Sequence, residues 1–254
     1  MSADKAWRVS GEGAVATVTL DRPDKHNLLK MSEVDDLIGD LDVLDADTSL
    51  RVIVVTGTGT RTFSAGVDLG DILTRDWTDN PVERLADRVE ALRPVTVAAL
   101  NGNVYGAAAD LALACDFRIG VEGMKLVMPP ARYGLVFHES GLRRFIEKLG
   151  PGTARQLFLA SCDMPARRLL ETGYLDRLCA RDDFAGTVKA FAGHLASLSP
   201  LSLAITSKAI TDISRGTLDS ARLKRETVAC FSTDDAREGM AAAREKRPPR
   251  FTGC

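Results

Sequence analysis

The first half of the chain alternates short apolar runs of strand length with stretches whose apolar residues recur at helical spacing. Residues 14–20 alternate apolar and polar positions, whereas residues 52–55 and 95–100 are unbroken apolar or β-branched runs, typical of strands buried on both faces. Shorter strands are predicted at residues 117–119 and 126–129. The predicted helices are residues 34–44, which follow a capping-box match at Ser32 and Asp35, residues 82–92, and the small-residue segment 106–114.

The second half of the chain shows helical periodicity and no convincing strand after Gly141. The predicted helices are residues 142–149, 154–159, 165–172, 184–198, 201–215 and 220–229. This change of pattern near residue 150 predicts an α/β core followed by a helical C-terminal part.

Composition and charge are those of an ordinary soluble globular protein and give no sign of a nucleic-acid or membrane partner. Of 254 residues, 45% are apolar and 27% are charged, and 33 basic against 35 acidic side chains give a net charge of -2. Apolar runs such as Val95–Leu100 are far shorter than the ~18 residues of a membrane span, and no signal peptide is recognisable. The five cysteines include no C-x-x-C pair and the three histidines are scattered. We therefore expect reduced thiols, a cytoplasmic location and no metal site.

Two strand-to-helix turns are candidates for anion binding: residues 63–69, which turn at Gly66, and residues 101–110, which turn at Gly106. Backbone N–H groups at helix starts lack intrahelical partners and favour negative charge, so two such turns can jointly hold a developing oxyanion. The alternative is that both are tight turns without chemistry. Thr62 replaces a glycine required by a dinucleotide-binding loop and by a nucleophile elbow, which disfavours a dinucleotide site and a hydrolase alike.

Four segments carry recognisable motifs. They are residues 14–29 (AVATVTLDRPDKHNLL), 52–72 (VIVVTGTGTRTFSAGVDLGDI), 95–119 (VTVAALNGNVYGAAADLALACDFRI) and 231–248 (FSTDDAREGMAAAREKRP). In this order they resemble the crotonase family, also called the enoyl-CoA hydratase/isomerase family. The resemblance implies a spiral α/β core of ββα repeats, assigned to residues 1–195, and a helical region, residues 196–254, that assembles homotrimers or dimers of trimers. It also implies a substrate carried as a coenzyme A thioester, with no metal or organic cofactor.

The resemblance further assigns residues to thioester binding. The main-chain N–H groups of Val67 and Ala107 fall where the family cradles the thioester oxygen, and the methyl group of Ala107, where the family usually has glycine, can crowd the acyl group. Other positions that correspond to coenzyme A or substrate contacts are Lys25, Ala65, Gly66, Asp68, Leu69, Gly106, Pro130 and Lys246. For the two lysines, a solvated surface position is the alternative.

Two positions depart from the hydratases of the family, which use two glutamates. Asp110 corresponds to the first glutamate and Pro130 to the second, and proline cannot transfer a proton. Residues 134–141 (GLVFHESG) look similar to isomerases that use a single glutamate, with Glu139 one residue later and His138 at the matching step. The candidate acid–base groups are therefore Glu139, Asp110 and His138, and Glu139 is expected to face the acyl pocket.

Each candidate also has a structural interpretation: Glu139 can pair with Arg143 or Arg144 on the surface, and Asp110 can be a buried cap. Among reactions, Δ3–Δ2-enoyl-CoA isomerisation is favoured over 2-enoyl-CoA hydration, and acyl-CoA decarboxylation or hydrolysis comes next. A non-catalytic scaffold that binds coenzyme A is the alternative of a different class, while the balanced charge disfavours RNA binding. The residues expected to shape the acyl pocket are Trp77, Leu85, Tyr105, Tyr133 and Phe137.

Overall fold

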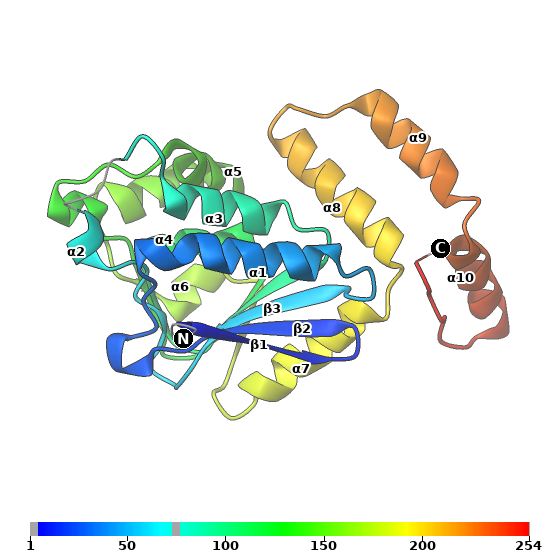
Figure 1. Ribbon diagram of the computed structural model, residues 1–254, viewed down its shortest axis with the longest axis horizontal. Coiled ribbons are helices and arrows are strands. Elements are labelled where there is room, and N and C mark those ends of the chain that lie inside the picture. The colour runs from blue at the N-terminus through cyan, green and yellow to red at the C-terminus, as the bar shows by residue number, and fades with distance from the viewer. Residues whose placement is uncertain (1–4, 73–76, 254) are drawn as a thin grey trace.

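The computed structural model describes residues 5–72 and 77–253, which form two sheets covered by helices (Figure 1). Pairs of strands followed by helices recur along the chain, as the ββα repeats predict. The elements of these repeats are β1 (Trp7–Glu12), β2 (Val15–Leu20) and α1 (Val34–Ala46); β3 (Val52–Gly57), β4 (Thr62–Ser64), α2 (Leu69–Ile72) and α3 (Pro81–Glu90); β5 (Val95–Leu100), β6 (Asn103–Tyr105) and α4 (Ala107–Ala114); β7 (Phe117–Val121), β8 (Lys125–Val127) and α5 (Glu139–Phe158). The elements that follow are β9 (Met164–Pro165), α6 (Ala166–Glu171), β10 (Arg177–Cys179), α7 (Phe184–Ala196), α8 (Pro200–Ser214), α9 (Ser220–Cys230) and α10 (Asp234–Glu245).

The strands of the repeats are divided between the two sheets. Within the described residues, the larger sheet has the order β1-β2-β3-β5-β7-β10 and the smaller one β4-β6-β8-β9. β3 and β5 are parallel neighbours in the larger sheet, and β4 and β6, which follow them in the chain, are parallel neighbours in the smaller sheet. The turns after β4 and β6 therefore emerge side by side.

The central strands are buried on both faces, as their apolar runs predict. The side chains of β3 and β5 are buried except for Thr56. One face packs in the cluster that also holds residues of α1, α3 and α4, while the other packs against Ala192 and Leu195 of α7. Figure 1 shows these helices on opposite sides of the sheet.

The prediction that no strand follows Gly141 is wrong. β10 adds to the larger sheet beside β7, and β9 pairs with β8. These strands have three and two residues, too few to show a period of two. β1, β4, β6 and α10 were also not predicted, and the helices expected at 142–149 and 154–159 form one element that is broken at Gly150, where φ is 76°.

Helix α1 does not use the predicted Ser32 cap. A 3-10 turn, Met31–Glu33, precedes the helix. The Glu33 carboxylate accepts the Lys30 N–H at 2.8 Å and pairs with Arg22 at 2.5 Å. Glu33 thus acts as the acidic member of a capping box that begins at Lys30, two residues before the predicted serine.

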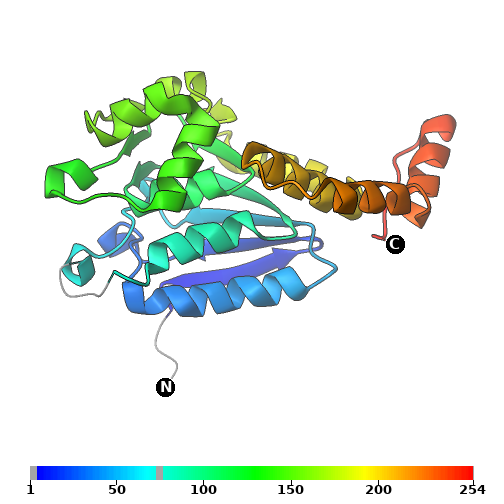
Figure 2. The ribbon, with the colours of Figure 1, turned by 90° about the horizontal axis from the view of Figure 1, so that it is seen from above.

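Helices α8 to α10 extend away from the two sheets (Figure 2). They carry exposed apolar side chains, namely Ile210, Ile213, Val228, Phe231 and Met240. In the described residues no single helix is long and apolar enough to cross a membrane, although α7 and α8, bent by 102°, pass that test of length and composition together.

Candidate active site

A pocket of about 260 Å³ opens where the turns after β4 and β6 meet the start of α3 and the segment before α5. Its walls are mostly apolar. The lining residues are Met31, Ala65, Val67, Trp77, Asn80, Val82, Gly106, Ala107, Pro129, Pro130, Tyr133, Leu135, Val136, Phe137 and His138. Five of the predicted site residues (Ala65, Val67, Gly106, Ala107 and Pro130) thus border it together with His138. Of the residues expected to shape it, Trp77, Tyr133 and Phe137 line the pocket, whereas Leu85 and Tyr105 do not.

The two turns touch each other through glycines with left-handed backbone. φ is +85° at Gly66 and +50° at Gly106. A Cβ atom on Gly66 would lie 2.9 Å from the Tyr105 carbonyl oxygen and 3.2 Å from the Ala107 amide nitrogen. A larger residue at Gly66 would therefore be strained and would push the turns apart.

This contact brings the backbone of Val67 next to that of Ala107. Ala107 is the first residue of α4, so helix geometry leaves its N–H without an intrahelical acceptor and at the positive end of the helix dipole. Among the described residues, neither amide donates a turn, cap or loop hydrogen bond. Both are thus available to an acceptor in the pocket.

Ser64 holds the first turn in place. Its hydroxyl donates to the Asn27 carbonyl at 2.8 Å and accepts the Gly66 N–H at 3.0 Å. The side chain is 1% exposed. Ser64 therefore has a structural role, in agreement with the rejection of a nucleophile elbow.

Asp110 lies on α4 directly behind the pocket wall and is fully buried. Its Oδ1 accepts a hydrogen bond from Arg144 at 2.6 Å. Burial raises the pKa of the Asp110 carboxyl above its ordinary value, against the opposing charge of Arg144. Within the described residues, Oδ2 of Asp110 makes no hydrogen bond, although His138 Nε2 is 3.4 Å away.

His138 links this buried acid to the pocket. It caps the N-terminus of α5, where its Nδ1 accepts the Gly141 N–H at 3.1 Å, so the neutral ring carries its proton on Nε2. Burial lowers the pKa of His138 below its ordinary value, while Asp110 and Glu83 act in the opposite direction. His138 and Asp110 are thus a buried imidazole–carboxylate pair at the pocket wall.

The prediction that Glu139 faces the acyl pocket is wrong. Its side chain is 83% exposed and pairs with Arg143 at 2.7 Å, which was the structural alternative. Successive residues of a helical turn point in directions about 100° apart. Because His138 turns inward as the cap, Glu139 points outward.

The remaining predicted contacts lie away from the lining of the pocket. Asp68 accepts the Gly70 N–H at 2.9 Å and so caps the following turn. Lys25 is exposed in the 3-10 turn Pro23–Lys25. Lys246 ends α10, which Figure 1 shows at the opposite end of the molecule from α2. The side chain of Leu69 lies outside the described residues.

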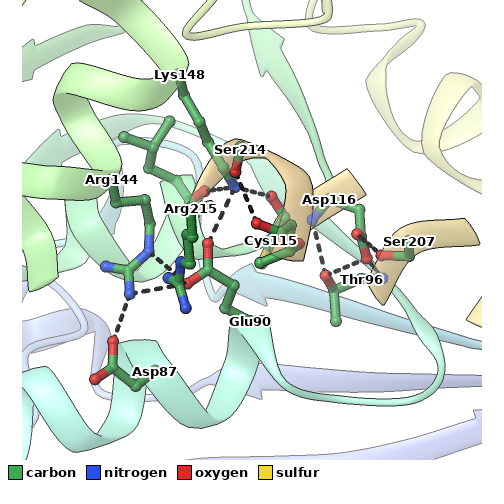
Figure 3. A network of polar contacts seen from close by, with 12 residues as sticks. Asp87, Glu90, Thr96, Cys115, Asp116, Arg144, Lys148, Ser207, Ser214 and Arg215 are labelled. Carbon is green, nitrogen blue, oxygen red and sulfur yellow. Dashed lines mark hydrogen bonds and ion pairs between the residues drawn. The ribbon is translucent and has the colours of Figure 1, made fainter. Parts of the chain in front are cut away.

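Through Arg144, Asp110 is connected to a network of charged side chains, which Figure 3 shows from Arg144 onward. Arg144 is fully buried and also contacts Asp87 at 2.6 Å and Glu90 at 3.3 Å. Glu90 in turn pairs with Lys148 at 3.8 Å and with Arg215, which follows α8. The sequence did not reveal this network because Asp87, Glu90, Arg144 and Lys148 occupy positions on predicted helices, where a charged residue needs no special explanation, and Arg215 lies far away in the chain.

Comparisons of sequence and of structure with known proteins match nearly the whole chain and agree on one family. The family model described as enoyl-CoA hydratase/isomerase matches residues 10–254. The chain is 31% identical to a "probable enoyl-CoA hydratase" of Mycobacterium leprae, covering 94% of this chain and 96% of that protein. It is 28% identical to the short-chain-enoyl-CoA hydratase of Clostridium acetobutylicum, covering 93% of each. The crystal structure of an enoyl-CoA hydratase/carnitine racemase from Magnetospirillum magneticum superposes with a TM-score of 0.93 at 28% identity, covering 99% of this chain and 97% of that one.

Proposed function

The chain belongs to the enoyl-CoA hydratase/isomerase family, a family of lyases and isomerases, and from this we propose that it shifts a double bond between Δ3 and Δ2 of an acyl-CoA thioester. The N–H groups of Val67 and Ala107 hold the thioester oxygen. Their free state and their position on the pocket wall support this role, since an oxyanion requires donors that are fixed before the reaction.

His138 moves the proton in this reaction. As a neutral imidazole it takes the proton from C2 of the 3-enoyl thioester on Nδ1, which releases the Gly141 N–H. The electron pair of the C2–H bond forms a dienolate whose charge rests on the thioester oxygen. The imidazolium then gives the proton to C4, where the C3–C4 π pair forms the new C–H bond. The C1–C2 π pair becomes the C2–C3 double bond, and a pair from the oxygen restores the thioester carbonyl. Asp110, 3.4 Å from Nε2, stabilises the imidazolium.

One observation carries the choice of isomerisation over hydration. Among the described lining residues, His138 is the one imidazole or carboxylate, because Pro130 replaces one acid of the hydratases and Glu139 points away. Isomerisation needs a single group that removes and returns a proton. Hydration needs a second group to orient the water.

A turnover comparison tests this proposal. Wild type, His138→Gln and the matched control Glu139→Gln are assayed with 3-enoyl-CoA and 2-enoyl-CoA. We expect the wild type to turn over the 3-enoyl substrate. His138→Gln should lower this turnover by about 10²–10⁴-fold, which is typical for the loss of a general base, and Glu139→Gln should leave it unchanged. Hydration of 2-enoyl-CoA without isomerisation would overturn the proposal.

A non-catalytic protein that binds coenzyme A is the second candidate. The observation that favours it is the short hydrogen bond from Arg144 to Oδ1 of Asp110, because this oxygen is then not available for proton transfer with a substrate. Calorimetric titration with coenzyme A and acyl-CoA, alongside the turnover assay, separates the two. Binding without turnover of any enoyl, malonyl or hydroxyacyl thioester favours the second candidate.

The proposal extends to assembly, phosphate contacts and location. We propose a homotrimer or a dimer of trimers, because exposed apolar side chains on α8 to α10, such as Phe231 at 73% exposure, are typical of interfaces. Lys25 contacts the coenzyme A phosphates bound to its own chain, whereas Lys246, which lies at the far end of the molecule, contacts those bound to a neighbouring protomer of this assembly. The reaction uses no metal or organic cofactor. The free thiols of Cys115, Cys162, Cys179 and Cys230 are consistent with a cytoplasmic location.

A further inference from the structure

We propose that Glu83 is a positioning residue for His138: its carboxylate holds the imidazolium that forms when His138 takes a proton from the substrate. This inference rests on the proposed function. It concerns a side chain of α3 that sequence reasoning did not single out. Glu83 Oε1 lies 3.6 Å from His138 Nδ1.

Glu83 is fixed to the first turn of α5 by a second contact. The same Oε1 atom accepts the Ser140 N–H at 3.1 Å, and the Ser140 hydroxyl is 3.3 Å from His138 Nδ1. Although burial alone would raise it, these bonds and His138 lower the pKa of Glu83, so the carboxylate is charged. A negative charge therefore stands beside Nδ1.

The proton that converts the neutral ring to imidazolium resides on Nδ1, since the neutral ring already carries a proton on Nε2. In the imidazolium, Nδ1 gives up the hydrogen bond from the Gly141 N–H, and each ring nitrogen then faces a carboxylate: Nε2 faces Asp110 and Nδ1 faces Glu83. The other charged groups around the ring are Asp87 of α3, which also favours the cation, and Arg144 of α5, which opposes it. Glu83 is the member of this set whose charge acts directly at Nδ1.

Glu83→Gln separates the electrostatic role from the structural one. Glutamine keeps an oxygen that can accept the Ser140 N–H but removes the negative charge. Glu139→Gln is the matched control, because it removes an equal charge from the residue next to His138 whose side chain faces solvent. Both variants are compared with wild type by NMR titration of ring-labelled histidine, with His138→Gln identifying the signal among the three histidines.

We expect Glu83→Gln to lower the pKa of His138 by about one unit, the lower end of the effect of an adjacent opposite charge, and Glu139→Gln to leave it near its wild-type value. With 3-enoyl-CoA, Glu83→Gln should lower kcat by up to about tenfold, without raising KM, because one unit of pKa is a factor of ten in proton affinity and the rate of a general base follows part of that factor. An unchanged His138 titration in Glu83→Gln would overturn the proposal.

Two further variants keep the test decisive if Glu83→Gln does not fold. Glu83→Asp and Glu83→Asn have nearly the same size and differ in charge, so the pKa of His138 should be higher in Glu83→Asp than in Glu83→Asn. Equal titrations in these two variants would also overturn the proposal. The titration needs no substrate, so its result for the pKa of His138 stands on its own. A lack of isomerase activity would refute the proposed function but not the electrostatic effect of Glu83 on His138.

Discussion

The two amides at the pocket can be tested by removing one donor without changing the shape of the site. Replacing Ala107 by lactic acid, its isosteric α-hydroxy acid, substitutes an ester oxygen for the N–H and keeps the methyl group. Ala107 is the first residue of α4, where the N–H has no intrahelical acceptor, so the helix loses no hydrogen bond of that group. The substitution should therefore lower turnover and leave the unfolding free energy nearly unchanged.

The expected magnitude follows from the number of donors. Two amides share the developing charge, and loss of one oxyanion donor typically costs about 10²–10³ in kcat, or about 2.7–4 kcal/mol of transition-state stabilisation. The matched control replaces Ala109 by lactic acid. Its N–H donates to the Gly106 carbonyl at 2.9 Å, so this change removes a structural hydrogen bond and should cost about 1 kcal/mol of unfolding free energy.

Single-turnover isomerisation of a 3-enoyl-CoA, together with the Kd for coenzyme A, gives the readout. We expect the Ala107 ester to lose turnover while it still binds coenzyme A, and the Ala109 ester to retain turnover. A comparable rate in the Ala107 ester and wild type, or equal losses in both esters, would refute the assignment of Ala107 as an oxyanion donor.

Three further outcomes follow from the buried groups and the glycine turn. Arg144→Met should lower the unfolding free energy by about 3–5 kcal/mol, since it leaves buried Asp110 unpaired, and Asp110→Asn in the same chain should restore part of it in urea titrations; equal stability of the single and double variants would contradict this. Burial lowers the pKa of His138 below 6.5, so the unfolded chain binds more protons than the folded chain as the pH falls below that value, and the unfolding free energy drops there. His138→Gln should make this drop smaller, as measured by unfolding at several pH values. Gly66→Ala should lose both turnover and about 1–3 kcal/mol of stability, whereas Gly13→Ala, also at positive φ but with open space around it, should lose stability alone in thermal unfolding.

The core of the fold could be predicted because burial leaves a clear mark on the sequence. β3 and β5 are covered on both faces, which requires unbroken apolar runs, and the small residues of α4 permit close contact with its neighbours. β9 and β10 left no such mark. Backbone hydrogen bonds to β8 and β7 define them, and those partners lie 38 or more residues earlier in the chain.

The site was predicted in part, and the errors have a common cause. Val67 and Ala107 present backbone N–H groups to the pocket at turns, and turn residues such as Gly66 are visible in a sequence. The roles of His138 and Glu139 depended on where α5 begins, because one residue decides which side chain turns inward as a cap. The preceding segment has no periodicity that fixes this register. Glu83 reaches His138 from another helix, which local spacing does not reveal.

The ion pair between Glu90 and Arg215 joins residues 125 positions apart, so the ribosome completes Glu90 long before it adds the partner of that carboxylate. When the ribosome has released β10, the nascent chain already contains the buried carboxylates of Glu90 and Asp110 with Arg144 and Lys148, but not yet Arg215. A buried carboxylate with too few cations is costly. Until α8 has left the ribosome, buried Glu90 therefore has only its longer contacts, to Arg144 at 3.3 Å and to Lys148 at 3.8 Å, and a product truncated before Arg215 would lack the third cation that pairs with this carboxylate.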